Sequence, residues 1–347
     1  MIDKYLIDSN STVKKTIEKM ELEKCDALLI VNSDRILLGI FTMGDMRRFF
    51  LRCVDLSVSI ENAMNKAPIV FYSRDEVAEY MSKHKLVVYP IVDECNRVID
   101  VIFNDSRVNE ENISSILHDI PLVIMAGGKG TRLYPYTKIL PKALIPIGEK
   151  TITERIINNF ERYGCKKVFF ILNYKSGMIK AYYNDLKKNY EVDYIDELNF
   201  LGTAGGLRLL KDKIKSTFFV SNCDILINAD LECIYKTHVT EKNKITFVCS
   251  MKELEIPYGV IETNSDGSIR KIKEKPEYSF LVNTGLYVLE PEVLNEIGVN
   301  EYIHLPDLAQ KYIERGERVG VFPISERAWM DMGQFNEMDK MLKTLGV

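Results

Sequence analysis

Apolar and polar positions follow two different patterns along the chain, and the change comes near residue 120. Before that point the pattern repeats weakly at an offset of 61 residues, with Glu18 falling on Glu79 and Val31 on Val92. In each copy, the pattern predicts a helix, a strand, a polar turn, a second strand and another helix. The predicted strands are DALLIV and RILLGIF in the first copy, and VVYPIV and RVIDVIF in the second. One such βαββα unit is too small to close a core, so we expect the two copies to pack together.

From Pro121 onward, short apolar runs alternate with helical patterns, which predicts an α/β domain with a doubly wound sheet. The expected buried strands are LVIM, VFFIL, TFFVSN and ITFVCS. Thr151 and Glu154 predict a capping box at the start of a helix that stops at Gly164. GVIET and SIRKIKE, separated by NSDG, predict a hairpin. We therefore expect three domains, at residues 1–66, 67–119 and 120–347.

The composition favours a cytoplasmic protein. Of its 347 residues, 46% are hydrophobic and 28% charged, and no apolar run approaches the ~18 residues that a membrane span needs. The N-terminus has no signal-peptide pattern. Seven scattered cysteines without a CxxC pair indicate free thiols in a reducing compartment. The net charge of -4 argues against nucleic-acid binding. We expect no nucleic-acid or membrane partner, and a homo-oligomer.

A glycine-rich loop, AGGKGTRLYPYTKILPKALIPIG, follows the first strand of the second half. Gly127, Gly128 and Gly130 let backbone N–H groups approach an anionic oxygen, and Arg132 and Lys142 supply cations at fixed spacing. This arrangement predicts a triphosphate site. The GK[ST] ending of a P-loop is missing, which disfavours an ATPase. The alternative is an ordinary βα turn with solvated cations, which the length of the whole pattern makes less favourable.

This loop matches the GGxGTRLxPxTxxxPKxLxPI signature of the sugar-nucleotide pyrophosphorylases, and the chain resembles that family from Pro121 to about Gln334. The resemblance implies a Rossmann-like, doubly wound mixed sheet of the GT-A-like nucleotidyltransferase type. It also implies transfer of a nucleotidyl group from an NTP to a sugar 1-phosphate, with release of pyrophosphate. The residues implied in catalysis are Arg132, Lys142 and Asp224. Those implied in nucleotide binding are Ala126, Gly127, Gly128, Gly130, Thr131, Glu197, Gly202 and Thr203.

Two aspartates match the metal-binding positions of the family. Asp224 follows the strand TFFVSN, and Asp331 lies in AWMDMGQF. Two carboxylates suit a hard cation that also holds phosphate oxygens, so Mg²⁺ is implied. A single carboxylate after a strand is often only a helix cap. The resemblance further implies that the sugar phosphate is held by Gly259, Glu274, Lys275 and Asn283.

The N-terminal repeat resembles a tandem CBS pair, spanning roughly Asp8 to Asp119. Its first copy carries the signature GIFTMGDMRR, in which Thr42 and Asp45 are placed to meet the phosphate and ribose of a regulatory nucleotide. In the second copy, Asp100 replaces the glycine that corresponds to Gly39. Ser106 stands where the ribose-binding aspartate is expected. We therefore expect one intact and one degenerate ligand site.

Glu197 is placed to select the nucleotide base, since an ionised carboxylate can accept from the N1–H and the 2-amino group of guanine. The alternative is that Glu197 only caps the loop. The spacing E-x₄-GTAGGL resembles guanylyltransferases of the mannose-1-phosphate type. The CBS-fused form resembles the glucosamine-1-phosphate guanylyltransferases of bacterial nonulosonic-acid pathways. We expect GTP and a hexose or hexosamine 1-phosphate, for bacterial glycan or nonulosonic acid biosynthesis.

Two alternatives stay open, namely a transferase that uses UTP or CTP and a non-catalytic CBS nucleotide sensor. The sensor is disfavoured because all the motif residues are present. A bifunctional transferase with a C-terminal acyltransferase β-helix is not expected, because no hexapeptide repeats follow Gln334.

Overall fold

The computed structural model describes residues 2–53, 55–104 and 116–346. Contacts divide the chain into two compact units, one formed by 1–111 with 252–281 and the other by 112–251 with 282–347. No helix in the described ranges is long and apolar enough to cross a membrane.

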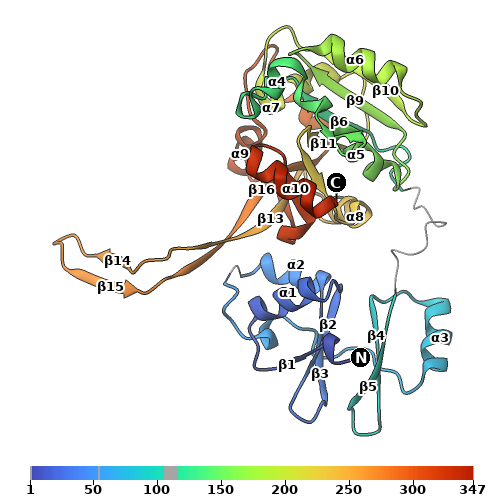
Figure 1. The fold of residues 1–347 in the computed structure, drawn as a ribbon, viewed down its shortest axis with the longest axis vertical. Helices are drawn as coiled ribbons and strands as arrows, with labels where there is room; N and C mark the ends of the chain where they lie inside the picture. The colour runs from blue at the N-terminus through green and yellow to red at the C-terminus, as the bar shows by residue number, and fades with distance from the viewer. Residues whose placement is uncertain (1, 54, 105–115, 347) are drawn as a thin grey trace. The chain divides into compact units, whose positions relative to one another are not determined.

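The first unit holds the two N-terminal repeats and a two-stranded ribbon, which is orange in Figure 1. Its elements are β1 (Leu6–Asp8), α1 (Val13–Leu22), β2 (Ala27–Val31), β3 (Leu37–Thr42), α2 (Met43–Phe50), α3 (Arg74–Lys83), β4 (Val88–Val92), β5 (Val98–Phe103), β14 (Val260–Thr263) and β15 (Ile269–Lys273). Strands β1, β2 and β3 form one sheet in that order, while β4 pairs with β5 and β14 pairs with β15.

The internal repeat is confirmed by the strand register. Ile30 lies opposite Gly39 in the antiparallel pair of β2 and β3, and Ile91 lies opposite Asp100 in β4 and β5. Both pairs carry a register shift directly after that position. The two copies also share one core, as we expected. Its buried members are Leu6, Ala27, Leu29, Val31, Leu37, Val88, Val92 and Val98.

The second unit is built on a seven-stranded mixed sheet. Its elements are β6 (Leu122–Ala126), α4 (Tyr136–Ile139), β7 (Pro146–Ile147), β8 (Lys150–Thr151), α5 (Ile152–Glu161), β9 (Lys167–Leu172), α6 (Ser176–Asp185), β10 (Glu191–Asp196), α7 (Gly202–Gly205), β11 (Phe218–Asn222), β12 (Ile225–Ile227), α8 (Leu231–Thr240), β13 (Ile245–Glu255), β16 (Glu277–Leu289), α9 (Leu305–Glu314), β17 (Val319–Ile324), β18 (Trp329–Asp331) and α10 (Phe335–Leu345). The outer ends of β13 and β16 belong to the first unit.

The strand order of this sheet is β10-β9-β6-β11-β16-β13-β17. Neighbours are parallel from β10 to β11 and between β13 and β17, whereas β11 and β16 are antiparallel. Both faces of the sheet are buried at its centre. On β9, Phe170 and Leu172 join one core cluster, while Phe169 and Ile171 join the other. The apolar run VFFIL is continuous for this reason. The α/β class and the mixed sheet are thus confirmed.

Several local predictions are also confirmed. The Thr151 hydroxyl accepts from the Glu154 N–H at 3.2 Å, and the Glu154 carboxylate accepts from the Thr151 N–H at 2.8 Å. β14 and β15 form the expected hairpin. β13 is longer than the six-residue run that predicted it, because it continues through the segment 251–255, most of which is polar and exposed. The apolar pattern reports burial, and therefore misses the part of a strand that leaves the core.

Candidate functional site

A buried ion pair lies where two segments meet at the end of the seven-stranded sheet. Lys142 begins the 3₁₀ turn Lys142–Leu144, and Asp224 follows β11. Their side chains form an ion pair, and each residue is 9% exposed. Removing two charges from water costs several kcal/mol for each ion, so such a pair is weak evidence for stability. Its position at the end of the central strands indicates a functional site instead.

Asp331 lies beside this pair. β18 runs antiparallel to β12, with Asp331 opposite Ile225, and the Met332 N–H donates to the Asp224 carbonyl at 2.8 Å. Burial and the negative charge of Asp224 raise the pKa of Asp331, while the charges of Lys142 and Arg132 oppose that shift. The charges of four residues predicted from the sequence therefore interact in the structure, namely those of Arg132, Lys142, Asp224 and Asp331.

The glycine-rich loop follows Ala126, the last residue of β6, and packs on the lysine of that pair. Gly130 has φ +65°, and a Cβ added there would lie 3.0 Å from Thr137 Cγ2 and 3.3 Å from Lys142 Cβ. A side chain at this position is therefore disfavoured both by the backbone and by the neighbours. Gly128 is exposed and has open space around it. The 3₁₀ turn that follows, Thr131–Leu133, leaves Thr131 and Arg132 exposed.

Glu197, in contrast, is buried without a partner for one of its oxygens. It is only 5% exposed, and Oε1 has no hydrogen bond among the residues that the structure describes. Its backbone is fixed, because its N–H donates to the Leu172 carbonyl at 2.7 Å and its carbonyl accepts from Asn173 Nδ2 at 2.8 Å. Burial raises the pKa of Glu197 to about 7. A buried acceptor left unsatisfied costs about 1–3 kcal/mol, which a ligand that donates to it can recover.

Glycines from two loops enclose the Glu197 carboxyl group. A Cβ added to Gly127 would lie 2.7 Å from Oε2, and one added to Gly206 would lie 2.2 Å from Oε1. Any larger residue would displace the carboxyl group. Gly127 was among the nucleotide-binding residues predicted from the sequence, whereas Gly206 and Asn173 were not. Asn173 could have been found, since it directly follows the apolar strand β9, whose carboxyl end borders the site.

The loop that contains Gly202 and Thr203 is held by the segment before α9. Gly202 has φ +83°, and a Cβ there would lie 2.5 Å from the Ile303 carbonyl oxygen. The Thr203 hydroxyl accepts from the Leu305 N–H at 3.1 Å and lies 3.4 Å from His304 Nδ1. The sequence gives no signal for His304, because it is 101 residues from Thr203. Only the fold brings them together.

The residues implied in sugar-phosphate binding are divided between the two units. Gly259, Glu274 and Lys275 belong to the first unit, whereas Asn283 belongs to the second. A Cβ added to Gly259 would lie 3.1 Å from Glu274 Oε2, so the PYGV and KEKP segments meet across the base of the ribbon. Lys275 has φ +43°, a backbone conformation that is uncommon for a residue with a side chain.

Asn283 is exposed on β16 and is held by short-range contacts. Its Oδ1 accepts from the Gly285 N–H at 3.0 Å, and its Nδ2 donates to the Tyr287 hydroxyl at 2.7 Å. Gly285 has φ +89°, and a Cβ there would lie 2.4 Å from Asn222 Nδ2. The VNTGL segment therefore packs directly on the end of β11, two residues before Asp224.

In the first unit, Thr42 and Asp45 cap the helix α2. The Asp45 carboxylate accepts from the Thr42 N–H at 3.0 Å and from its hydroxyl at 2.7 Å, and it also pairs with Arg48. Asp45 lines a cavity of about 540 Å³, together with Arg48, Arg52, Asn62 and Asn65. The sequence predicted only Thr42 and Asp45 as ligand contacts, so the two arginines of this cavity, Arg48 and Arg52, were missed.

The second repeat differs at the equivalent position. Asp100 replaces Gly39, and its carboxylate binds Arg74 at 2.5 Å. In the first repeat, a Cβ added to Gly39 would lie 2.7 Å from the Asn65 carbonyl oxygen. Ser106, which we placed at the degenerate ribose position, lies outside the described residues.

Comparison with known proteins gives matches in both halves of the chain. Residues 122–345 match the family model of the nucleotidyl transferases, and residues 1–52 match that of the CBS domain. The chain is 31% identical over 234 residues to UTP–glucose-1-phosphate uridylyltransferase of Synechocystis sp., covering 61% of this chain and 60% of that protein. It is 30% identical over 223 residues to mannose-1-phosphate guanylyltransferase catalytic subunit beta of Drosophila melanogaster, covering 61% and 59%.

Among solved structures, HddC from Yersinia pseudotuberculosis matches with a TM-score of 0.52 at 22% sequence identity, covering 65% of this chain and 99% of that one. At this identity the match shows the fold alone. The chain spans about 60% of the length of the two curated relatives named above.

Proposed function

The chain belongs to the nucleotidyl transferase family, and we propose that it transfers a nucleotidyl group from an NTP to a sugar 1-phosphate. The observation that carries this proposal is the cluster of Lys142, Asp224 and Asp331 at the end of the central sheet, next to the glycine-rich loop. Arg132 adds a second cation to the cluster. This is the set of charges that a reaction between two phosphate anions requires.

In the proposed reaction, a phosphate oxygen of the sugar 1-phosphate attacks the α-phosphorus of the NTP. A new P–O bond forms as the bond from the α-phosphorus to the bridging oxygen of the β-phosphate breaks. The products are an NDP-sugar and pyrophosphate, and no covalent enzyme intermediate is required. Lys142 and Arg132 stabilise the charge that builds up, and the glycine loop orients the triphosphate.

Members of the family generally use a divalent metal ion, and we propose Mg²⁺ for this chain. The residues fit such an ion. Asp224 and Asp331 are adjacent, and their mutual repulsion contributes to the raised pKa of Asp331. A hard dication between them would offset that repulsion and would neutralise phosphate oxygens when bound. Asp224 and Asp331 would hold the ion, beside the Lys142 ammonium group that pairs with Asp224.

For the nucleotide base we propose guanine, so that GTP is the donor. Glu197 has a buried oxygen without a partner among the described residues, and the two glycines that enclose its carboxyl group carry no side chain that would displace it. An ionised carboxylate accepts two adjacent N–H donors, which guanine presents and uracil does not. A relative named as a guanylyltransferase is about as similar as one named as a uridylyltransferase, so the comparisons leave the choice to this chemistry.

For the acceptor we propose a hexose or hexosamine 1-phosphate, made into an NDP-sugar for bacterial glycan or nonulosonic acid synthesis. Lys275 would pair with its phosphate. Glu274, Asn283 and the Gly259 backbone would bind hydroxyl groups. Glu274 is exposed and lies next to Gly259 on the ribbon, which supports their joint role.

We further propose that the cavity beside Asp45 binds a regulatory nucleotide. Arg48 and Arg52 supply two cations for its phosphates, and Asn62 and Asn65 can hydrogen-bond to the rest of the ligand. Asp45 itself is already engaged by Thr42 and Arg48, so its first task is to hold the cavity wall.

The proposed activity is tested by incubating the protein with each NTP and a panel of hexose and hexosamine 1-phosphates, and measuring pyrophosphate release. We expect release with GTP and one class of sugar phosphate, and only when Mg²⁺ is present. If no combination releases pyrophosphate while nucleotides still bind the protein, the chain is a sensor and the proposed activity is wrong.

A further inference from the structure

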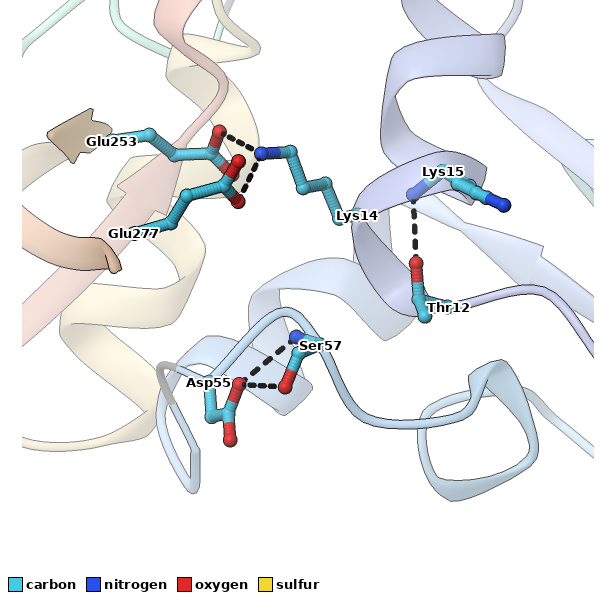
Figure 2. Close-up of polar contacts among 7 residues, drawn as sticks. All are labelled: Thr12, Lys14, Lys15, Asp55, Ser57, Glu253 and Glu277. Carbon is cyan, nitrogen blue, oxygen red and sulfur yellow. Dashed lines mark hydrogen bonds and ion pairs between the residues drawn. The ribbon is translucent and has the colours of Figure 1, made fainter. Parts of the chain in front are cut away.

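Lys14 joins the first helix of the CBS module to the two strands that lead into and out of the ribbon. Its Nζ lies 3.1 Å from a carboxylate oxygen of Glu253 and 2.5 Å from one of Glu277. Glu253 lies on β13 and Glu277 begins β16. Figure 2 shows one ammonium group between the two carboxylates, all three within the first unit. The carboxylate of Glu277 raises the pKa of Lys14, which keeps the lysine charged.

The helix itself gains nothing from this lysine. Thr12 is the N-cap of α1, so Lys14 lies in the first turn, where the helix dipole favours an anion over a cation. Lys15, the next residue, is turned away from the two glutamates in Figure 2. The position of Lys14 is therefore explained by its contacts with β13 and β16.

The same helix start is bonded to the wall of the CBS cavity. The N–H groups of Val13 and Lys14 donate to the carbonyls of Val58 and Leu56, both at 2.9 Å. Val58 also lines the cavity that holds Arg48 and Arg52. A ligand that moves this wall would therefore move the backbone of Lys14.

Glu277, one of the two partners of Lys14, is close in sequence to the residues that we propose to bind the sugar phosphate. Glu277 is two positions from Lys275 in the sequence, and the Ile256 N–H donates to the Pro276 carbonyl at 3.0 Å, which joins the two strands at this level. Fixing Glu277 restricts the backbone on which Lys275 and Glu274 are carried. Restricting that backbone before the substrate arrives reduces the entropy that binding must otherwise remove.

We propose that Lys14 is a positioning residue for sugar-phosphate binding, through which the CBS module holds the ribbon strands and reports the state of its cavity. This rests on the proposed function, because it assumes that Lys275 and Glu274 bind the sugar phosphate. Lys14 itself touches no substrate. Its effect should appear in the KM for the sugar 1-phosphate and not in the kcat or in the KM for the NTP.

The test compares Lys14→Ala with Lys15→Ala, which removes the same charge from the next position of the same helix. At low ionic strength, Lys14→Ala should raise the KM for the sugar 1-phosphate about two- to fivefold, as expected for a partly exposed ion-pair network. Its kcat and its KM for GTP should stay within about twofold of the wild type, and Lys15→Ala should leave all three unchanged. About 0.5 M salt should bring wild type and Lys14→Ala together, because the contact is screened.

Two further measurements separate this proposal from the activity. Amide hydrogen exchange of the segment 256–281 should be faster in Lys14→Ala than in Lys15→Ala, whatever reaction the protein catalyses. The charge swap Lys14→Glu with Glu277→Lys should restore slow exchange, and it should restore the KM as well. Equal exchange in the two single variants would overturn the proposal. If exchange is altered but the KM for the sugar 1-phosphate is not, Lys14 does hold the ribbon strands, but Lys275 does not bind the sugar phosphate. The positioning role of Lys14 would then be rejected.

Discussion

Two of the lysine–carboxylate groups that the structure describes differ mainly in their burial. Lys142 and Asp224 have side chains that are 10% and 13% exposed, beside the half-buried carboxylate of Asp331. Lys14 and its partners Glu253 and Glu277 are 26%, 34% and 51% exposed. We therefore propose that the two groups serve different purposes. In the buried group each charge depends strongly on the others, because little water remains to screen them. In the exposed group water and salt weaken the attraction, and exposed pairs contribute about 0.2–1 kcal/mol.

This difference explains why the first group suits catalysis and the second suits regulation. A site that stabilises a transition state needs charges that are fixed and poorly solvated before the substrate arrives. A contact that reports ligand binding must instead be weak enough to open and close. We expect larger effects of substitution at the carboxylates of the catalytic half than at the exposed arginines of the CBS cavity.

The largest effect is expected for the two aspartates. Asp224→Asn and Asp331→Asn should each reduce kcat by on the order of 10²-fold or more, because each removes a charge that holds the cation and the phosphates. Pyrophosphate release at saturating substrates measures this, with and without a chelator. The control is Asp193→Asn, which removes an exposed carboxylate of β10 near Lys167. Near-normal turnover in Asp331→Asn, or in excess chelator, would refute the metal role.

A smaller but more specific effect is expected for Glu197. Glu197→Gln replaces one acceptor oxygen by an N–H donor, which no longer matches guanine but does match the imide of uracil. The ratio of kcat/KM for GTP to that for UTP should fall by on the order of 10²-fold. The matched control is Asp196→Asn, since Asp196 is the exposed neighbour that pairs with Lys180. A competition assay with five NTPs gives the ratio, and an unchanged base preference would contradict the role of Glu197.

Glu197 should also make binding and stability depend on pH, in opposite directions. Burial raises its pKa from 4.5 to about 7, so between these values the folded protein binds more protons than the unfolded chain. Its contribution to the free energy of unfolding therefore falls as pH rises through that window. GTP binding needs the ionised form, so kcat/KM for GTP should instead rise about tenfold between about pH 6 and pH 8.

Thermal melts and initial rates across this range test both slopes. The amide of Glu197→Gln does not titrate. This variant should therefore lose the part of the pH dependence of stability, and of kcat/KM for GTP, that comes from Glu197. If Glu197→Gln keeps the slope of the wild type, or if Asp196→Asn loses it, the titrating group is not Glu197.

The smallest effect in this series is expected at the CBS cavity. Arg52→Ala should weaken nucleotide binding there about fivefold, because the pocket is partly open to solvent and the lost contact is screened. Asp45→Ala is a poorer test, since it also removes the capping box of α2. The control is Arg74→Ala, which breaks the exposed pair with Asp100 in the second repeat. Nucleotide-induced shifts in melting temperature should decrease only in Arg52→Ala, and equal shifts in both variants would reject the cavity as the site.

Much of the fold could be predicted because it depends on local periodicity. The run VFFIL predicted β9, and Thr151 with Glu154 predicted the start of α5, since burial pattern and capping act over a few residues. The 61-residue repeat was visible for the same reason. The resemblance to a known family also implied Lys142, Asp224 and Asp331 as site residues, and the structure brings these three together.

The amino-acid sequence by itself thus determined the elements, their order, the glycine loop and the carboxylates that follow the strands. The tertiary structure alone decided which groups meet. It placed Gly206 against Glu197 and His304 against Thr203, and it joined Lys14 to Glu277 across 263 positions. These contacts depend on strand order and register, which are set by the packing of the whole sheet and leave no periodic trace in the sequence. The burial that shifts the pKa of Glu197 arises in the same way, because water is excluded only when distant segments close over the carboxyl group.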